Sequence, residues 1–263
     1  MPEDNNPVIE VIDLSASYGH EPILHDINFK VNPNEVFAVL GGSGCGKSTL
    51  LKHITGLYCP VKGDIIIHGE SIVKASGDKR REIMRSFGVT YQGGALWGSL
   101  TVGENVSLPL EEYTSLSRKQ IRAVVDEKLH LVQMDGFRDY MPAELSGGMR
   151  KRAGLARAMA LSPKLLFFDE PSAGLDPITS ARLDELILRL RDECDTTIMV
   201  VTHELDSIFT IADRVIMLSK ETKSIVAEGD PRYLRDKSPD PWVREFMTRG
   251  ASLRLAGSIP QST

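Results

Sequence analysis

The chain has 263 residues, of which 36 are acidic and 31 are basic, for a net charge of −5. This length allows one large domain, or one domain with a sizeable insertion. The balanced charge argues against nucleic acid as a partner, because nucleic-acid binders usually carry a strongly basic patch. The three cysteines form no paired or metal-binding motif, which favours a reducing compartment.

Two features bear on membranes. Residues 1–6 are polar and acidic, unlike a secretory signal. The longest apolar runs, such as 198–201, have the length of a strand and fall well below the ~20 residues that cross a bilayer. We therefore expect any membrane role to come through a partner.

The first third of the chain is rich in strand patterns. Short runs of β-branched and other apolar residues predict strands at 8–12, 27–31, 36–40 and 64–69. The first two are expected to bracket a loop containing Tyr18, and the third is apolar throughout, as in a strand covered on both faces. Helices are expected at 47–56 and, in a polar segment, at 76–85.

Helical patterns follow, and then an alternation of strands and helices. Apolar residues recur near a 3.6-residue period over 118–133. Later apolar runs predict strands at 165–168, 198–201, 215–218 and 224–227. An amphipathic helix is expected at 178–193, between the first two of these strands. This alternation predicts a parallel α/β core with a helical insertion. Near the end we expect a short helix around 242–247 and then a loose tail.

A phosphate-binding loop follows the third predicted strand, with the pattern GxxxxGKS/T. The loop consists of Gly41, Gly42, Ser43, Gly44, Cys45, Gly46, Lys47, Ser48 and Thr49. Its glycines let backbone N–H groups surround phosphate oxygens, and the next helix points its positive end at them. Lys47 is expected to contact the β- and γ-phosphates and Ser48 to bind Mg²⁺, whereas Cys45 is interpreted as a small filler.

Two adjacent carboxylates end the apolar strand at 165–168. A buried carboxylate needs a partner, and for Asp169 in a P-loop enzyme the natural one is Mg²⁺. Because consecutive strand residues face opposite ways, Glu170 is free for a separate task, and we assign it to the attacking water. The alternative is that Glu170 is an acid at a helix start, stabilised by the helix dipole.

A second anion site is predicted where Ser146, Gly147 and Gly148 precede a helix. Ser146 is a good N-cap, and its hydroxyl and the following N–H groups can bind an anion. Two such sites in one chain suggest one nucleotide held between two chains. The alternative is an ordinary capped helix.

Three further residues are weaker candidates when taken singly. His203 follows an apolar strand, at the edge where α/β proteins bind ligands, and we expect it to contact the γ-phosphate. A core histidine is the alternative. Gln92 could reach the metal or the water. Tyr18 could stack on adenine, or could be a half-buried tyrosine at a strand edge.

Taken together, these motifs resemble those of the nucleotide-binding subunit of ABC transporters over about residues 7–235. The resemblance places the Walker A motif at 41–49, the signature at 145–149, the Walker B motif at 165–169 and the D-loop at 173–176. It implies that Glu170, His203 and Gln92 are catalytic. It also implies ATP and Mg²⁺ as cofactors, with metal ligands at Ser48, Gln92 and Asp169. Tyr18, the Walker A loop and Ser146, Gly147 and Gly148 would bind the nucleotide.

The resemblance also implies a fold and its divisions. The fold is an α/β P-loop NTPase (RecA-like) core with an N-terminal antiparallel β subdomain and an inserted α-helical subdomain. The ATPase domain is expected at 7–245, and the tail at 246–263. Within the domain, the core and β subdomain take 7–92 and 163–235, and the helical insertion takes 93–162.

A narrower resemblance rests on the signature, which ends in Met149 where the family usually has glutamine. Together with segments 92–97, 101–106 and 169–178, it is similar to ATPases of the Mla/MCE type. These ATPases energise phospholipid transport between bacterial membranes. The resemblance implies a homodimer at the cytoplasmic face of the inner membrane, with an integral permease and MCE-domain lipid-carrier subunits. Alternatives are an amino-acid or efflux ATPase, or a non-transport ABC scaffold.

Two apolar segments could contact partners. Leu96, Trp97 and Leu100 follow Gln92 and could form a groove for a permease helix, or could pack the helical insertion. Trp242 and Phe246 could brace the dimer, or could dock the tail on its own domain.

Overall fold

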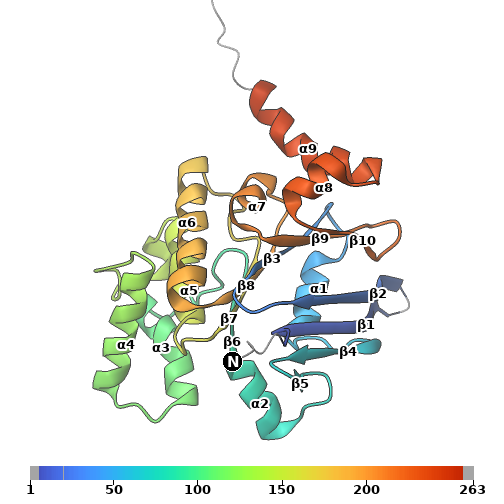
Figure 1. The fold of residues 1–263 in the computed structure, drawn as a ribbon. Coiled ribbons are helices and arrows are strands. Elements are labelled where there is room, and N and C mark those ends of the chain that lie inside the picture. The colour runs from blue at the N-terminus through green and yellow to red at the C-terminus, as the bar shows by residue number, and fades with distance from the viewer. Residues whose placement is uncertain (1–5, 20, 257–263) are drawn as a thin grey trace, which may run out of the picture.

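The computed structural model describes residues 6–19 and 21–256 and contains two β-sheets (Figure 1). The smaller sheet is antiparallel, with strand order β2-β1-β4-β5. Its strands are β1 (Ile9–Tyr18), β2 (Glu21–Val31), β4 (Lys62–Ile67) and β5 (Glu70–Ser71). This sheet agrees with the antiparallel β subdomain expected near the N-terminus.

The first two strands are longer than the sequence indicated. We expected a loop between 12 and 27, but β1 and β2 pair from Ile9 with Val31 to Tyr18 with Glu21. Asp13 and Asp26 both adopt a φ of 47°, and the register shifts along this pair. The backbone N–H of Asp13 donates to the Asn28 side chain over 2.8 Å. Bulges therefore accommodate polar residues that we interpreted as a loop.

The larger sheet has strand order β10-β9-β3-β8-β7-β6, parallel except for β10. Its strands are β3 (Val36–Gly41), β6 (Phe87–Thr90), β7 (Leu165–Asp169), β8 (Thr197–Val201), β9 (Arg214–Leu218) and β10 (Ile225–Gly229). Every residue of β3 and β8 is buried, as the continuous apolar runs predicted. The phosphate-binding loop and the Walker B carboxylates follow β3 and β7 at their carboxyl ends.

Helix α1 (Lys47–Ile54) joins the two sheets into one core. Its Leu50, Leu51 and Ile54 belong to a buried cluster that also contains residues of β1 and β3. Helix α2 (Gly77–Arg85) precedes β6. Helices α6 (Pro177–Cys194) and α7 (Leu205–Ile211) follow β7 and β8, as in α/β units.

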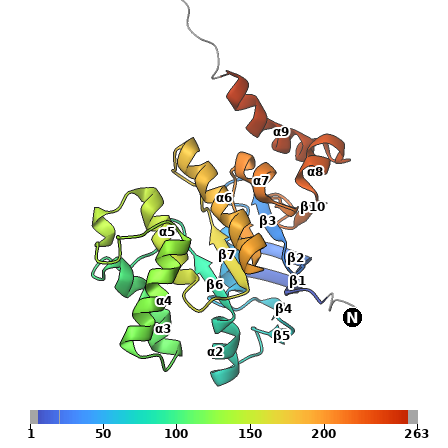
Figure 2. The same ribbon diagram turned by 60° about the vertical axis from the view of Figure 1, so that its left-hand side comes forward.

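The helical insertion lies to one side of the larger sheet (Figures 1 and 2). It contains α3 (Val102–Tyr113), α4 (Arg118–Leu131), the 3₁₀ turn η1 (Pro142–Glu144) and α5 (Gly147–Ala158). Thr101 with Glu104 and Ser117 with Gln120 form capping boxes that start α3 and α4. One apolar cluster joins these helices to α6 and to the inner strands.

The chain ends in α8 (Pro231–Lys237) and α9 (Pro241–Ala256). Val243 and Met247 of α9 are buried against α7, so this helix docks on its own domain. It also continues to Ala256, beyond the short helix that we expected around 242–247. Residues 257–263 of the expected tail lie outside the described residues. No helix within 6–19 and 21–256 is long and apolar enough to cross a membrane.

Candidate functional site

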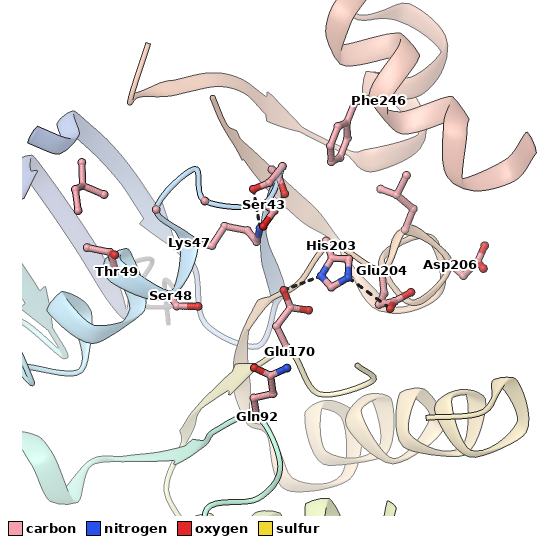
Figure 3. A pocket seen from close by; sticks show the side chains of 16 residues that line it. Ser43, Lys47, Ser48, Thr49, Gln92, Glu170, His203, Glu204, Asp206 and Phe246 are labelled. Carbon is pink, nitrogen blue, oxygen red and sulfur yellow. Dashed lines mark hydrogen bonds and ion pairs between the residues drawn. The ribbon is translucent and has the colours of Figure 1, made fainter. Parts of the chain in front are cut away.

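A cavity of about 1030 Å³ opens between the phosphate-binding loop and the ends of β7 and β8 (Figure 3). One wall consists of Gly41, Gly42, Ser43, Gly44, Gly46, Lys47, Ser48 and Thr49. The opposite side is lined by Gln92, Glu170 and His203. Residues from sequence segments far apart therefore face one space large enough for a small-molecule ligand.

The loop requires glycine at Gly41 because its φ is 151° and a Cβ there would lie 2.5 Å from the carbonyl oxygen of Leu218. Cys45 is 2% exposed and belongs to the core cluster beneath the loop. Burial raises the pKa of its thiol, and the nearby Lys47 ammonium opposes this shift. The structure therefore agrees with its interpretation as a filler.

Lys47 begins α1 and is buried within the loop. Its Nζ donates to the carbonyl oxygens of Gly41 over 2.8 Å and Gly42 over 3.2 Å. The ammonium and the first N–H groups of α1 therefore lie at the same end of the cavity. A positive charge combined with a helix N-terminus favours phosphate.

Asp169, at the end of β7, faces this helix. The Ser48 hydroxyl donates to Asp169 Oδ1 over 3.2 Å. Burial raises the pKa of Asp169, and the hydrogen bond from Ser48 opposes this shift. A hydroxyl and a carboxylate side by side are oxygen ligands of the kind that Mg²⁺ prefers.

The neighbouring Glu170 lies just beyond the end of β7 and has different partners. Its carboxylate accepts a hydrogen bond from the Thr202 hydroxyl over 3.1 Å and lies 2.8 Å from His203 Nδ1. Its backbone adopts a left-handed φ of 49°, and its N–H donates to Val201 O over 2.8 Å. The two carboxylates therefore have separate partners, one toward α1 and one toward the end of β8.

His203 is 56% exposed at its side chain and lines the cavity, so it is not a core histidine. Its Nε2 lies 3.8 Å from Glu204 Oε1, and Glu170 approaches the ring from the other side. Figure 3 shows Gln92 pointing into the same space as Glu170. These three predicted catalytic residues thus share one cavity.

Other predicted residues lie outside this cavity. Tyr18 is 51% exposed and packs edge-on against Tyr58, with ring centroids 6.0 Å apart. Ser146, Gly147 and Gly148 start α5, where the Ser146 hydroxyl accepts the Met149 N–H over 3.3 Å. None of these four predicted residues lines the cavity.

The cavity also contains residues that were not predicted to belong to it. Ile23, Glu204, Leu205, Asp206 and Phe246 complete its lining. Residues 204–206 directly follow His203, and this position in the sequence could have predicted that they line the cavity. Phe246 comes from α9, and no motif marks it, because its place depends on how α9 packs against α7.

A strand, a phosphate-binding loop, a helix and a carboxylate at the end of a second strand define a P-loop ATPase. A family model described as "ABC transporter" matches residues 24–173. The chain belongs to the ABC transporter family, and it is an ATPase that binds and hydrolyses ATP.

Several relatives share most of the chain. "Intermembrane phospholipid transport system ATP-binding protein MlaF" of Escherichia coli (strain K12) is 38% identical over 91% of this chain and 88% of its own length. "Probable ribonucleotide transport ATP-binding protein mkl" of Mycobacterium tuberculosis (strain ATCC 25618 / H37Rv) is 43% identical over 91% of this chain. The chain spans 66% of the length of that relative.

Solved structures share the fold. CbiO1 from Clostridium perfringens, part of the ABC transporter complex cbiONQ, superposes with a TM-score of 0.80 and 27% identity, covering 96% of this chain and 97% of that one. The dimeric ATP-binding cassette MJ0796, bound to ADP and Pi, superposes with a TM-score of 0.77 and 29% identity. The match covers 84% of this chain and 98% of that one. The expected α/β fold, with its RecA-like core, antiparallel β subdomain and helical insertion, is confirmed.

Proposed function

We propose that this chain is the ATP-hydrolysing subunit of a transporter that moves phospholipids between bacterial membranes. The observation that supports hydrolysis most strongly is the convergence of Lys47, Glu170 and His203 on one cavity. The phospholipid cargo is supported by the MlaF relatives, which are 37% and 38% identical over most of both chains. The more identical mkl relatives carry a ribonucleotide transport name, which makes ribonucleotides the second candidate cargo.

The residues predicted from the sequence have proposed roles in and around the cavity. Lys47 binds the β- and γ-phosphates, and Glu170 accepts a proton from the attacking water. His203 contacts the γ-phosphate and, through its 2.8 Å contact, orients the Glu170 carboxylate. Ser48, Asp169 and Gln92 would bind Mg²⁺, which neutralises phosphate charge when present. The oxygen atoms of Ser48 and Asp169 fit that ion. Tyr18 stays our candidate for the adenine.

We further propose that each nucleotide is shared between two copies of the chain. The start of α5 offers a serine hydroxyl and free N–H groups, yet Ser146 does not line the cavity of its own chain. A second copy placed head to tail would bring Ser146 and Gly148 to the γ-phosphate. The dimeric form of MJ0796 supports this arrangement.

Replacing Ser146 with arginine tests the shared site. We expect Ser146→Arg to bind ATP with unchanged affinity in a titration but to lose hydrolysis by ~10²-fold or more, because the bulky cation prevents closure. Ser117→Arg is a matched control, since Ser117 caps α4 in the same way. Normal hydrolysis by Ser146→Arg would rule out the shared site.

The permease contact is assigned to Trp97. Trp97 is 63% exposed, whereas Leu96 packs against the core. The side chain of the buried Asn105 accepts from Trp97 N over 2.7 Å and donates to Trp97 O over 3.1 Å, which fixes the loop. A rigid loop that displays an exposed indole is suited to receive a partner helix. We place the chain at the cytoplasmic face of the inner membrane.

Copurification tests the transporter role. From detergent-solubilised membranes, the chain should bring an integral permease and MCE-domain lipid carriers, and Trp97→Ser should lose them while keeping its basal ATP hydrolysis. Reconstituted with these partners, the complex should move labelled phospholipid between vesicles only with ATP. Transfer of ribonucleotide instead of phospholipid would favour the second candidate. Copurification without any membrane protein would exclude the transporter role.

A further inference from the structure

Lys151 of α5 contacts a group of backbone carbonyl oxygens, and none of the roles assigned so far explains these contacts. Its Nζ donates to the carbonyl oxygens of Pro171 over 2.7 Å and Ala173 over 2.6 Å, and lies 3.5 Å from that of Glu170. An ammonium group has three N–H donors, and this one meets three carbonyl acceptors. We call residues 170–173 the carbonyl turn.

The carbonyl turn starts at the residue that carries the proposed catalytic carboxylate. Glu170 adopts a φ of 49°, a left-handed conformation that is unfavourable for a residue other than glycine. Such a conformation persists only where its surroundings hold it. Within the turn, the Ala173 N–H donates to Glu170 O over 3.3 Å, and the Leu175 N–H donates to Ser172 O over 3.0 Å. Lys151 contacts the carbonyl oxygens of Glu170, Pro171 and Ala173.

Because Lys151 is partly buried, removing its ammonium should affect the carbonyl turn. Lys151 is half-buried and lies beside Phe168, Pro171 and Leu183. Burial lowers the pKa of its ammonium, and the nearby Glu170 and Glu204 carboxylates raise it. Without the ammonium, three carbonyl dipoles would point at one spot with no cation between them. The turn would then lose the contacts that hold its carbonyl side, while the bond from Glu170 N–H to Val201 O would remain.

We propose that Lys151 is a positioning residue for ATP hydrolysis. It holds the carbonyl turn so that the Glu170 carboxylate faces the nucleotide cavity. It does not touch the nucleotide cavity itself, because its contacts are backbone oxygens behind the carboxylate. The proposal rests on the proposed role of Glu170 as the base.

The other basic side chains of α5 do not share this role. Arg150 donates to Leu145 O, Arg152 to the Gln133 side chain, and Arg157 to Gly94 O and Ala95 O. Lys151 is the α5 cation whose contacts reach the carbonyl turn. If positive charge on this helix had a general effect, replacing any of these four cations would lower turnover. A positioning effect would appear only when Lys151 is replaced.

The experiment compares Lys151→Met with Lys164→Met in the full-length chain. Lys164 also donates to a backbone carbonyl, Cys194 O over 2.9 Å, but at the end of α6. We expect Lys151→Met to keep its KM and affinity for ATP within about 2-fold while kcat falls ~10–100-fold, the cost of a misplaced catalytic group. Lys164→Met should match the wild type. Unchanged kcat, or a matching rise in KM, would overturn the proposal.

A double variant separates positioning from any independent effect. If Lys151 acts through Glu170, Lys151→Met added to Glu170→Gln should lower the residual single-turnover rate no further. An added loss equal to that of Lys151→Met alone would show that Lys151 acts on its own, and would overturn the proposal. Should Lys151→Met fail to fold in a thermal melt, Lys151→Gln replaces it, with the same expected split between KM and kcat.

The role of Glu170 as the base and the role of Lys151 in positioning it are contradicted by different results. Normal turnover by Glu170→Gln alone would remove the assignment of the base and, with it, the role of Lys151. Loss of turnover by Glu170→Gln together with wild-type kcat in Lys151→Met would leave the base in place and reject only the positioning role.

Discussion

Two adjacent residues, Asp169 and Glu170, take different partners in this chain. Asp169 accepts a hydrogen bond from Ser48, and Glu170 contacts Thr202 and His203. We expected separate roles for the two carboxylates from the alternation of side chains along a strand, but β7 ends at Asp169, so alternation does not account for the direction of Glu170. The left-handed backbone at Glu170 was not predictable, because only the contacts of the folded chain stabilise it.

Asp184 of α6 is a buried carboxyl outside the cavity. It forms a hydrogen bond with Ser207 of α7, and the Asp206 carboxylate lies near. Burial raises the pKa of Asp184 to about 6, against an ordinary value of 3.8, although the hydrogen bond from Ser207 lowers it. The folded state therefore retains this proton more tightly than the unfolded state does.

The sign of the resulting pH dependence is definite. The contribution of Asp184 to the free energy of unfolding is fully present below about pH 4 and is lost as the pH rises through about 6. By pH 7 the loss reaches roughly 1–3 kcal/mol. Asp184→Asn should therefore raise Tm at pH 7 and flatten its dependence between pH 4 and 6. Glu185→Gln, an exposed neighbour on α6, is the control. A lower Tm for Asp184→Asn at pH 7 would contradict this.

At the scale of elements, α5 contacts two loops of the site. Lys151 donates to the carbonyl turn, and Arg157 donates to Gly94 O over 3.1 Å and Ala95 O over 2.8 Å in the loop after Gln92. Gly154 lets this loop approach the helix backbone closely. The helix that starts with the signature is therefore joined to both the proposed base and the Gln92 loop.

Gly154→Ala tests the tightness of that contact. A Cβ at this position would lie 2.7 Å from Gly94 O and 2.8 Å from Gly94 Cα, and neither backbone atom can give way cheaply. We expect overpacking to lower the free energy of unfolding by about 1–3 kcal/mol. This loss exceeds the ~1 kcal/mol that a helix gains when alanine replaces glycine. Gly98→Ala, with nothing within 4 Å, should be neutral. Urea unfolding measures both, and a stabilised Gly154→Ala would refute the close contact.

The elements differ in how far the sequence predicted them. The buried strands β3, β7 and β8 were predictable because strands covered on both faces are apolar throughout. The β1–β2 hairpin was missed because its strands are bulged and half exposed, so polar residues interrupt the pattern. A helix around 242–247 was expected, but the continuation of α9 to Ala256 was missed.

At the scale of the whole molecule, the two anion-binding features are separate. The cavity contains Lys47 and Glu170, while Ser146 stands outside it at the start of α5. The two motifs were recognisable in the sequence because each depends on local chemistry, namely glycines and a helix N-terminus. The site as a whole was predictable only as two halves, since in our proposal its completion requires a second chain.

Turnover as a function of chain concentration tests the shared site most directly. With saturating ATP and no membrane partner, we expect the hydrolysis rate per chain to fall steeply on dilution, in step with the loss of dimer measured by light scattering. A constant rate per chain in preparations that contain only monomer would contradict the account.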